Sequence, residues 1–288
     1  IVMPKTKVNL NPKLIQKDSN LCNLFCKAKI RYKNSTCSVN MENNYLTYII
    51  DNTSNILKYN FMTENNIPIS YTLKKIIPYI PSIHQIENSS YDMEVHLYHQ
   101  SSDQTKTLVV AVLINIGDNI TNSSDFLWNI INPLKNTTPS TQPKSISVYS
   151  NWTPSNLLPM IRSFYTYANA GDLFNNKPED TNTTYIIYEN NVNIHIKDFK
   201  ILNDSINGRN NKVSNVKYLN NLEVFYNNDL PVGLGSALKG KSYYKCQKVI
   251  TNNGSKTISS NTTNINNKTK SYNFFTTSGW YTLRGIII

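Results

Sequence analysis

The sequence predicts a mainly β protein with a few surface helices. Short runs rich in β-branched and aromatic residues recur along its 288 residues, and such runs are typical of strands. Asn, Asp, Ser and Pro separate these runs, as they do where turns join strands. Two segments combine apolar residues at helical spacing with start or stop signals. Strands should therefore outnumber helices and carry the core.

The predicted elements can be placed along the chain in order. Strands are expected at residues 45–50, 93–98, 107–114 and 185–188. A helix is expected at 126–131, because the Ser-Ser-Asp of residues 123–125 can cap its start and Pro133 follows its end. A second short helix is expected near residues 196–202.

Composition divides the chain near residue 231. Residues 1–230 have the mixed composition of a compact domain, whereas residues 231–288 are rich in Lys, Ser, Thr and Asn and predict an extension. No run approaches the 18 or so apolar residues of a transmembrane helix. This extension is expected to pack on the domain, on another subunit or on nothing. The isoleucines at residues 286–288 raise the alternative that it leads to a membrane anchor beyond residue 288.

The charge balance favours anionic partners. The net charge is +11, from 29 Lys and Arg against 18 Asp and Glu. No run reaches five basic residues, so a nucleic-acid-binding tail is not expected. Abundant Asn, Ile and Lys, with 45 asparagines, are typical of an AT-rich genome. The candidate residues for binding an anionic glycan are Lys27, Lys29, Arg31, Lys33, Lys74 and Lys75.

Four cysteines leave their redox state open. Three lie near the start of the chain and one near the end: Cys22, Cys26, Cys37 and Cys246. An even number permits two disulfides in three possible connectivities. Buried free thiols are the alternative. A zinc site is not expected, because the Cys-x-x-x-Cys spacing at residues 22–26 is a poor match to one.

Three of the four histidines lie around one predicted strand: His84, His96 and His99. Side chains two residues apart share a face of a strand, so Glu94 and His96 should point the same way and His99 the opposite way. A carboxylate two residues before a histidine can orient that imidazole or an adjacent one. We expect His99 to be a core histidine with its hydrogen bonds satisfied.

These residues resemble the α-type carbonic anhydrase family over roughly residues 7–230. Glu94, His96 and His99 match its Glu-x-His-x-x-His strand, which carries the third zinc-binding histidine. His84, twelve residues before His96, matches its structural histidine. Further matches in order lie at residues 108–118, 126–134, 156–159, 164–167 and 185–195. The resemblance implies the fold of that family, with a large, twisted, mostly antiparallel central sheet.

The departures from the family imply that catalysis is lost. The family's other two zinc ligands form a His-x-His pair, and this chain has no His-x-His anywhere. A count without gaps places that pair at Tyr71 and Leu73. The catalytic threonine of the family falls near Asn175, and the glutamate beside the structural histidine falls at Ile83. A catalytic zinc needs three protein ligands, so we expect no metal, no other cofactor and no enzymatic activity.

A fold without its metal is expected to act as a binding module, with His96 and Glu94 as relics of the zinc site. The inactive members include a poxvirus envelope protein that attaches virions to sulfated glycosaminoglycans. This chain is similar to it in its lost ligands, basic charge and C-terminal extension. We therefore expect a protein of a large DNA virus, on the virion surface or otherwise extracellular, that binds an anionic glycan or host-cell receptor. The alternative is a minor capsid or spike component that assembles with other virion proteins.

Overall fold

The computed structural model describes residues 5–10, 28–42, 44–60, 67–118, 122–136, 146–168, 182–213, 216–218, 224–227 and 246–249. Contacts within the chain group Ile1–Ser255 in one compact unit and Lys256–Ile288 in a second. None of the second unit belongs to the described residues, so the expected anchor at the end of the chain lies outside them. The boundary at residue 231 stays a prediction, although residues of the expected extension form one strand of the sheet described next.

The structure is built mainly from strands, which confirms the predicted fold class. The strands are β1 (Lys5–Leu10), β2 (Ala28–Arg31), β3 (Ser35–Glu42), β4 (Tyr45–Ile50), β5 (Ile56–Tyr59), β6 (Ile69–Tyr79), β7 (His84–Ile86), β8 (Met93–Ser101), β9 (Thr107–Ile116), β10 (Ile146–Trp152), β11 (Phe164–Ala168), β12 (Thr183–Tyr188), β13 (Val192–Ile194), β14 (Val216–Tyr218), β15 (Val224–Asn227) and β16 (Cys246–Val249). The helices are α1 (Asn122–Ile131) and α2 (Ile196–Ser205), with 3-10 turns η3 (Asn132–Asn136) and η4 (Pro154–Leu157).

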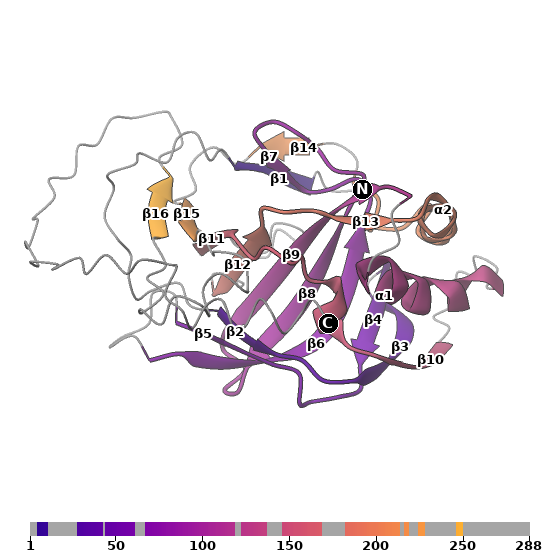
Figure 1. The fold of residues 1–288 in the computed structure, drawn as a ribbon, viewed down its shortest axis with the longest axis horizontal. Coiled ribbons are helices and arrows are strands. Elements are labelled where there is room, and N and C mark those ends of the chain that lie inside the picture. Colours follow the sequence, from indigo (N-terminus) through magenta and orange to yellow (C-terminus); the bar gives the residue numbers. More distant parts are fainter. Residues whose placement is uncertain are drawn as a thin grey trace, which may run out of the picture. The chain divides into compact units, whose positions relative to one another are not determined.

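Thirteen of the described strands form one large sheet. Its order is β10-β3-β4-β6-β8-β9-β12-β11-β15-β16, and β2, β5 and β13 pair alongside that path (Figure 1). Neighbours are antiparallel except where β12 and β13 pair with β9. A small second sheet places β1 between β7 and β14, parallel to both. The mostly antiparallel central sheet is therefore as expected.

The central strands bury different residues on their two faces. On one face β8 contributes Met93, Val95 and Leu97 to a core that also contains α1 and α2, here called the helix-side core. The opposite face carries a smaller core rich in tyrosine, built mainly from β9, β11 and β12. Side chains alternate along a strand, so Glu94 and His96 lie on the tyrosine-rich face.

Both expected helices form, with different starts. α1 begins at Asn122, so Ser123 and Ser124 lie buried in its first turn, and the expected cap at residues 123–125 is wrong. α2 begins at Ile196 as expected. The His195 side chain caps it, because its Nδ1 accepts a hydrogen bond from the backbone N–H of Lys197 at 3.2 Å. Within the described ranges, neither helix has the length and apolar character needed to cross a membrane.

One buried side chain links two strands of the sheet. The amide of Asn211 accepts a hydrogen bond from the backbone N–H of Leu46 at 2.6 Å. It donates to the carbonyl oxygens of Leu46 and Pro78 at 3.1 and 2.7 Å. This amide therefore satisfies backbone groups of β4 and β6 that face no strand neighbour there.

Candidate functional site

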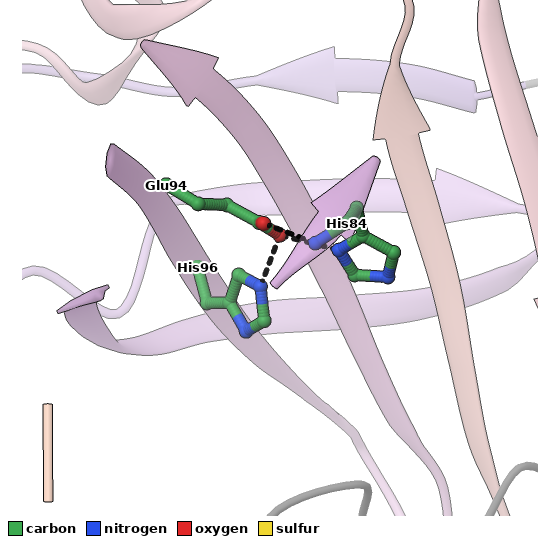
Figure 2. Close-up of side chains that lie close together, drawn as sticks. All are labelled: His84, Glu94 and His96. Carbon is green, nitrogen blue, oxygen red and sulfur yellow. Dashed lines mark hydrogen bonds and ion pairs between the residues drawn. The ribbon is translucent and has the colours of Figure 1, made fainter. Parts of the chain in front are cut away.

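A carboxylate between two imidazoles lies at the centre of the sheet. His84 comes from β7, and Glu94 and His96 come from neighbouring positions on one face of β8. All three residues are fully buried. The structure therefore brings together three of the residues that the sequence singled out (Figure 2).

The Glu94 carboxylate accepts four hydrogen bonds. Its Oε1 lies 2.5 Å from both His84 Nδ1 and His96 Nε2. Its Oε2 accepts from the backbone N–H groups of Ile83 and His84, each at 2.8 Å. The Ser82 hydroxyl holds this loop by donating to the His84 carbonyl oxygen and accepting from the backbone N–H of Tyr91, both at 2.9 Å. The carboxylate is therefore fixed in one position.

These contacts determine the charge of Glu94 and the tautomers of its neighbours. Burial alone raises the pKa of Glu94, but the His84 and His96 imidazoles and their hydrogen bonds lower it well below its usual range. An ionised carboxylate only accepts, so His84 Nδ1 and His96 Nε2 both carry hydrogens. His84 Nε2 then accepts from the Tyr167 hydroxyl at 2.6 Å. His96 Nδ1 lies on the side away from Glu94, next to the Tyr98 hydroxyl.

His84, Glu94 and His96 each offer a ligand atom, and these atoms lie within 4.8 Å of one another. The two imidazole N–H groups, however, already point at the same carboxylate oxygen. A cation among them would have to displace both hydrogens. The arrangement instead has the carboxylate–histidine form that orients an imidazole.

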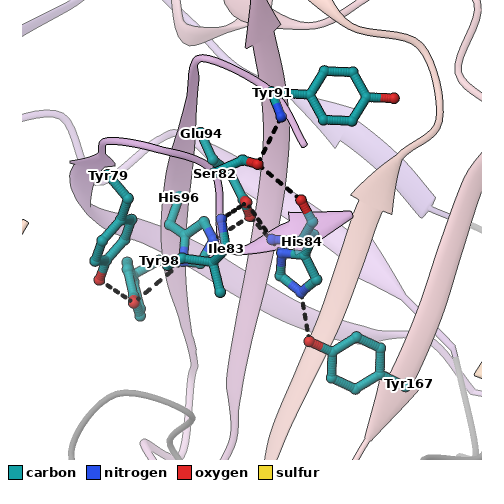
Figure 3. Close-up of polar contacts among 9 residues, drawn as sticks. All are labelled: Tyr79, Ser82, Ile83, His84, Tyr91, Glu94, His96, Tyr98 and Tyr167. Carbon is teal, nitrogen blue, oxygen red and sulfur yellow. Dashed lines mark hydrogen bonds and ion pairs between the residues drawn. The ribbon is translucent and has the colours of Figure 1, made fainter. Parts of the chain in front are cut away.

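Two aromatic rings pack against His96. The Tyr79 ring centroid lies 4.8 Å from that of His96, and the Tyr98 ring centroid lies 5.9 Å away. The Tyr98 hydroxyl is 3.5 Å from His96 Nδ1 and 3.1 Å from the Tyr79 hydroxyl (Figure 3). Tyr98 packs against a small buried cluster that we call the plug, consisting of Tyr45, Ile77, Tyr79, Ile83 and Val213.

The strand register corrects the predicted positions of the lost ligands. Tyr71 pairs with Ser101 and Leu73 with His99, so both lie on the face away from His96. Both belong to the helix-side core. A β-bulge between Leu73 and Lys75 shifts the alternation of β6. Beyond it, Ile77 lies directly opposite His96.

Tyr79 lies directly opposite Glu94 in the same register. Ile77 and Tyr79, rather than Tyr71 and Leu73, therefore flank His96 on its own face. Ile83, the expected position of the lost glutamate, is fully buried in the plug. Asn175 lies outside the described residues.

His99 points away from the triad, as the alternation predicts. Its Nδ1 donates to the Leu108 carbonyl oxygen at 3.1 Å, and its Nε2 accepts from the Tyr32 hydroxyl at 2.7 Å. Burial lowers the pKa of His99 to about 4, although the hydrogen bond to Leu108 opposes that shift. It is a neutral core histidine with both nitrogens satisfied.

The prediction of a disulfide is wrong for Cys37, one of the four cysteines. Cys37 is buried in β3 as a free thiol, and burial raises its pKa to about 12. Such a thiol is inert, as the alternative interpretation expected. Cys22, Cys26 and the side chain of Cys246 lie outside the described part of the chain.

Several candidate basic residues gather on one face of adjacent strands. Lys29 of β2 lies directly opposite Lys58 of β5, and Arg31 follows two residues along on the same face. The pairings of β5, β6 and β8 place Lys75 on that face as well. We call Lys29, Arg31, Lys58 and Lys75 the basic face. Its first three residues are exposed and Lys75 is half-buried.

The remaining basic candidates lie next to the basic face or outside the residues that the structure describes. Lys74 is exposed within the bulge of β6, and Lys33 is exposed just after β2. Lys27 lies outside the described residues. The sequence prediction missed Lys58, because only the pairing of β2 with β5 shows that it faces Lys29.

Comparison with known proteins agrees with this architecture. The profile of the eukaryotic-type carbonic anhydrase family matches residues 7–227. No curated protein matches the sequence significantly.

Similar solved structures share the fold at low sequence identity. Dioscorin in complex with ascorbate is 19% identical, with a TM-score of 0.59 over 79% of this chain and 87% of that chain. Carbonic anhydrase Cah3 from Chlamydomonas reinhardtii, in complex with acetazolamide, is 16% identical, with a TM-score of 0.59 over 77% and 90%. The α-carbonic anhydrase of Thermovibrio ammonificans, in complex with sulfanilamide, is 17% identical, with a TM-score of 0.58 over 77% and 86%.

Proposed function

The chain belongs to the eukaryotic-type carbonic anhydrase family, and from that premise we propose that it is a non-catalytic member that binds an anionic glycan. The observation that carries the proposal is that Ile77 and Tyr79 lie opposite His96 and Glu94. The family needs a second and a third imidazole beside His96 to hold zinc. Isoleucine offers no ligand and the residues present do not fit zinc, so no zinc-bound hydroxide is expected to form.

The plug supports the loss of catalysis independently of the ligand count. Hydration of carbon dioxide requires water next to the metal. Here Ile77 lies opposite His96 on the neighbouring strand, and Ile77, Ile83 and Tyr79 are buried in the plug at 6%, 0% and 1% exposure. Apolar side chains packed in that way favour exclusion of water from the site.

The basic face supports an anionic ligand. Like charges directly opposite each other on neighbouring strands are destabilising, and Lys29 and Lys58 are such a pair. An anion held between them would relieve the repulsion through charge-assisted hydrogen bonds. Ser70 pairs with Lys58 and Thr72 pairs with Gln100, which adds neutral hydrogen-bonding side chains on the same face.

A sulfated or otherwise anionic glycan fits such a surface better than a small ion. Neighbouring strands lie about 4.8 Å apart, so basic residues on β2, β5 and β6 present charges in successive rows. A polymer with regularly repeated anionic groups can contact several rows at once. Dioscorin, a protein of the same fold, is solved with the organic molecule ascorbate bound.

We further propose that the protein acts outside the cell, on the surface of a virion of a large DNA virus. The support is the composition typical of an AT-rich genome, the net charge of +11 and the resemblance to a viral attachment protein. The alternative, a structural part of a capsid or spike, depends on residues 231–288, of which only β16 is described. β16 pairs with β15 of this same chain.

The catalytic half of the proposal is tested with zinc present. Purified protein, supplemented with zinc, should give no acceleration of carbon dioxide hydration above buffer. Elemental analysis after dialysis should find no stoichiometric zinc. Hydration that scales with protein concentration and stops on addition of acetazolamide would overturn this half.

The binding half is tested by heparin affinity across a salt series, because screening weakens exposed charge interactions steeply. The double variant Lys29→Glu, Lys58→Glu should lower heparin affinity at least about tenfold at low salt. The double variant Lys197→Glu, Lys200→Glu on α2 changes the net charge equally and should bind nearly as the parent does. An equal loss of heparin affinity in both double variants would show that net charge alone is responsible for heparin binding.

A further inference from the structure

The turn that follows α2 presents an Asn-Gly-Arg sequence to solvent. The backbone N–H of Arg209 donates to the Ile206 carbonyl oxygen at 3.0 Å and closes a β-turn, whose two central residues are Asn207 and Gly208. Both central residues are exposed. Ile206 before them and Asn211 after them are fully buried. The tip of the turn is therefore accessible, while its two ends are fixed to the core.

The contacts of Asn207 and Gly208 leave both of their reactive groups available. Among the described residues, neither the Asn207 side chain nor the backbone N–H of Gly208 has a hydrogen-bond partner. Gly208 has a φ of +73°, and nothing lies within 4 Å of the position that a β-carbon would occupy there. Glycine has no side chain to hinder its own nitrogen, so this nitrogen can approach the Asn207 side-chain carbonyl carbon, Cγ.

We propose that Asn207 is a site of spontaneous deamidation, and that its isoaspartate product forms, together with Arg209, a ligand for a cell-surface receptor. The receptor class is one that binds a carboxylate through a divalent cation and a guanidinium through its own carboxylates. The receptor part rests on the proposed location outside the cell, whereas the deamidation part rests only on the turn. Neither part uses the basic face or the triad.

The deamidation step needs only water. The Gly208 backbone nitrogen loses its proton to hydroxide and bonds to Asn207 Cγ. The bond from Cγ to Nδ2 breaks, and the leaving nitrogen takes protons from water to become ammonia. One water molecule then opens the resulting five-membered imide at either carbonyl group, which gives aspartate or isoaspartate. No atom changes its oxidation state.

The product carries a pair of opposite charges that the parent turn lacks. Isoaspartate lengthens the main chain by one methylene and leaves a carboxylate branching from it, one glycine before Arg209. Oxygen ligands of this kind bind divalent cations such as Ca²⁺ and Mg²⁺. The Nε of Arg209 donates to the Ser205 carbonyl oxygen at 3.0 Å, which positions the guanidinium beside the turn.

The two terminal nitrogens of Arg209 have no hydrogen-bond partner in the part of the chain that the structure describes. They can therefore pair with a receptor carboxylate through two parallel hydrogen bonds. The fold should tolerate the longer turn. The Asn44 amide reaches the Gly208 carbonyl oxygen only at 3.5 Å, while the backbone N–H of Asn210, beyond the altered bond, donates to the Asn44 carbonyl oxygen at 3.0 Å.

The first test follows deamidation in the full chain. Purified protein is incubated at neutral and at mildly alkaline pH, and peptide mapping is combined with an isoaspartate-specific methyltransferase assay. We expect isoaspartate to accumulate at Asn207, faster at the higher pH because the attacking nitrogen must lose a proton, with no change in the urea midpoint of unfolding. Asn207→Gln should yield none there, because glutamine would have to form a six-membered ring. Aged parent protein without isoaspartate at Asn207 would overturn the inference.

The second test measures binding to an integrin headpiece in manganese buffer, because integrins hold ligand carboxylates on a divalent cation. Aged parent protein should bind at least about tenfold more tightly than fresh protein, and chelation should abolish the gain. Aged Asn207→Gln should show no gain. Arg209→Lys should deamidate normally but bind weakly, since an ammonium cannot form the bidentate pair. Isoaspartate at Asn207 without this gain, or an equal gain in Asn207→Gln, would refute the receptor assignment.

Glycan binding is decided separately. Neither Asn207 nor Arg209 belongs to the basic face, so Asn207→Gln and Arg209→Lys should bind heparin as the parent does. Loss of heparin binding in the basic-face variants therefore says nothing about this turn, and failure of the integrin assay leaves the glycan proposal standing.

Discussion

Ile77 lies directly opposite His96 across the antiparallel pair of β6 and β8, so the two side chains share one face of the sheet. The family's zinc ligands must meet on that face. The proposed loss of catalysis therefore depends more directly on the apolar side chain at this point than on any feature of the composition.

A first prediction is that a zinc site can be introduced by design. The double variant Ile77→His, Tyr79→His should place two imidazoles beside His96 and bind one zinc per chain, measured by elemental analysis after dialysis. Tyr71→His, Leu73→His introduces the same side chains on the opposite face and should bind none. Zinc bound by the Tyr71→His, Leu73→His variant rather than by the Ile77→His, Tyr79→His variant would show that the register of β6 against β8 is misassigned.

A second prediction concerns the buried carboxylate. Glu94→Gln removes an ion that accepts hydrogen bonds from two imidazoles and two backbone N–H groups. The free energy of unfolding should fall by about 3–5 kcal/mol, measured by urea denaturation. Glu87→Gln, on an exposed turn, should change it by less than about 0.5 kcal/mol. A loss below about 1 kcal/mol at Glu94 would contradict a fully ionised, fully paired carboxylate.

A third prediction is acid sensitivity through His99. Unfolded histidine takes up a proton below about pH 6.5, whereas the pKa of buried His99 is lowered to about 4. Between these values the unfolded state binds more protons, so stability falls as the pH falls, by up to about 3 kcal/mol in all. Denaturant unfolding from pH 7 to pH 4.5 measures this slope.

The matched variants for that slope are His99→Gln and His195→Gln. The first should be less stable at every pH but should lose this part of the pH dependence. His195 lies at the start of α2 outside the core, and its replacement controls for the removal of a histidine elsewhere in the chain. An unchanged slope in His99→Gln would assign the acid sensitivity to another group.

A fourth prediction is that stability and ligand binding oppose each other on the basic face. Lys58→Glu replaces a repulsive cross-strand pair with an attractive one beside Lys29, and should stabilise the fold by about 0.2–1 kcal/mol. The same change should weaken heparin binding. Thermal unfolding and heparin retention on the same sample measure both effects, and Lys200→Glu should alter neither appreciably. Stabilisation without weaker binding would exclude Lys58 from the ligand surface.

Local pattern predicted the main elements and the triad well. The alternation of β8 correctly placed Glu94 and His96 on one face and His99 on the other, because that strand is regular over its length. It also identified His84, whose distance from His96 along the chain carries the family resemblance. These features depend on spacing within one short segment.

Features that depend on irregular backbone or distant pairing were missed. The bulge of β6 near Lys74 reverses which side chains face the triad, and no local pattern signals it. The count without gaps therefore selected Tyr71 and Leu73 from the wrong face. Lys58 joins Lys29 only because β2 and β5, more than twenty residues apart, pair in one register.

The amide of Asn211 has a consequence for the lifetime of the protein in storage. Slow deamidation would turn it into an aspartate, which donates no hydrogen bond and would place a negative charge against the carbonyl oxygens of Leu46 and Pro78. Asn211 is fully shielded from solvent in the folded chain. Among 45 asparagines, exposed ones should age first and harmlessly, while damage at this position would occur only once the sheet has opened.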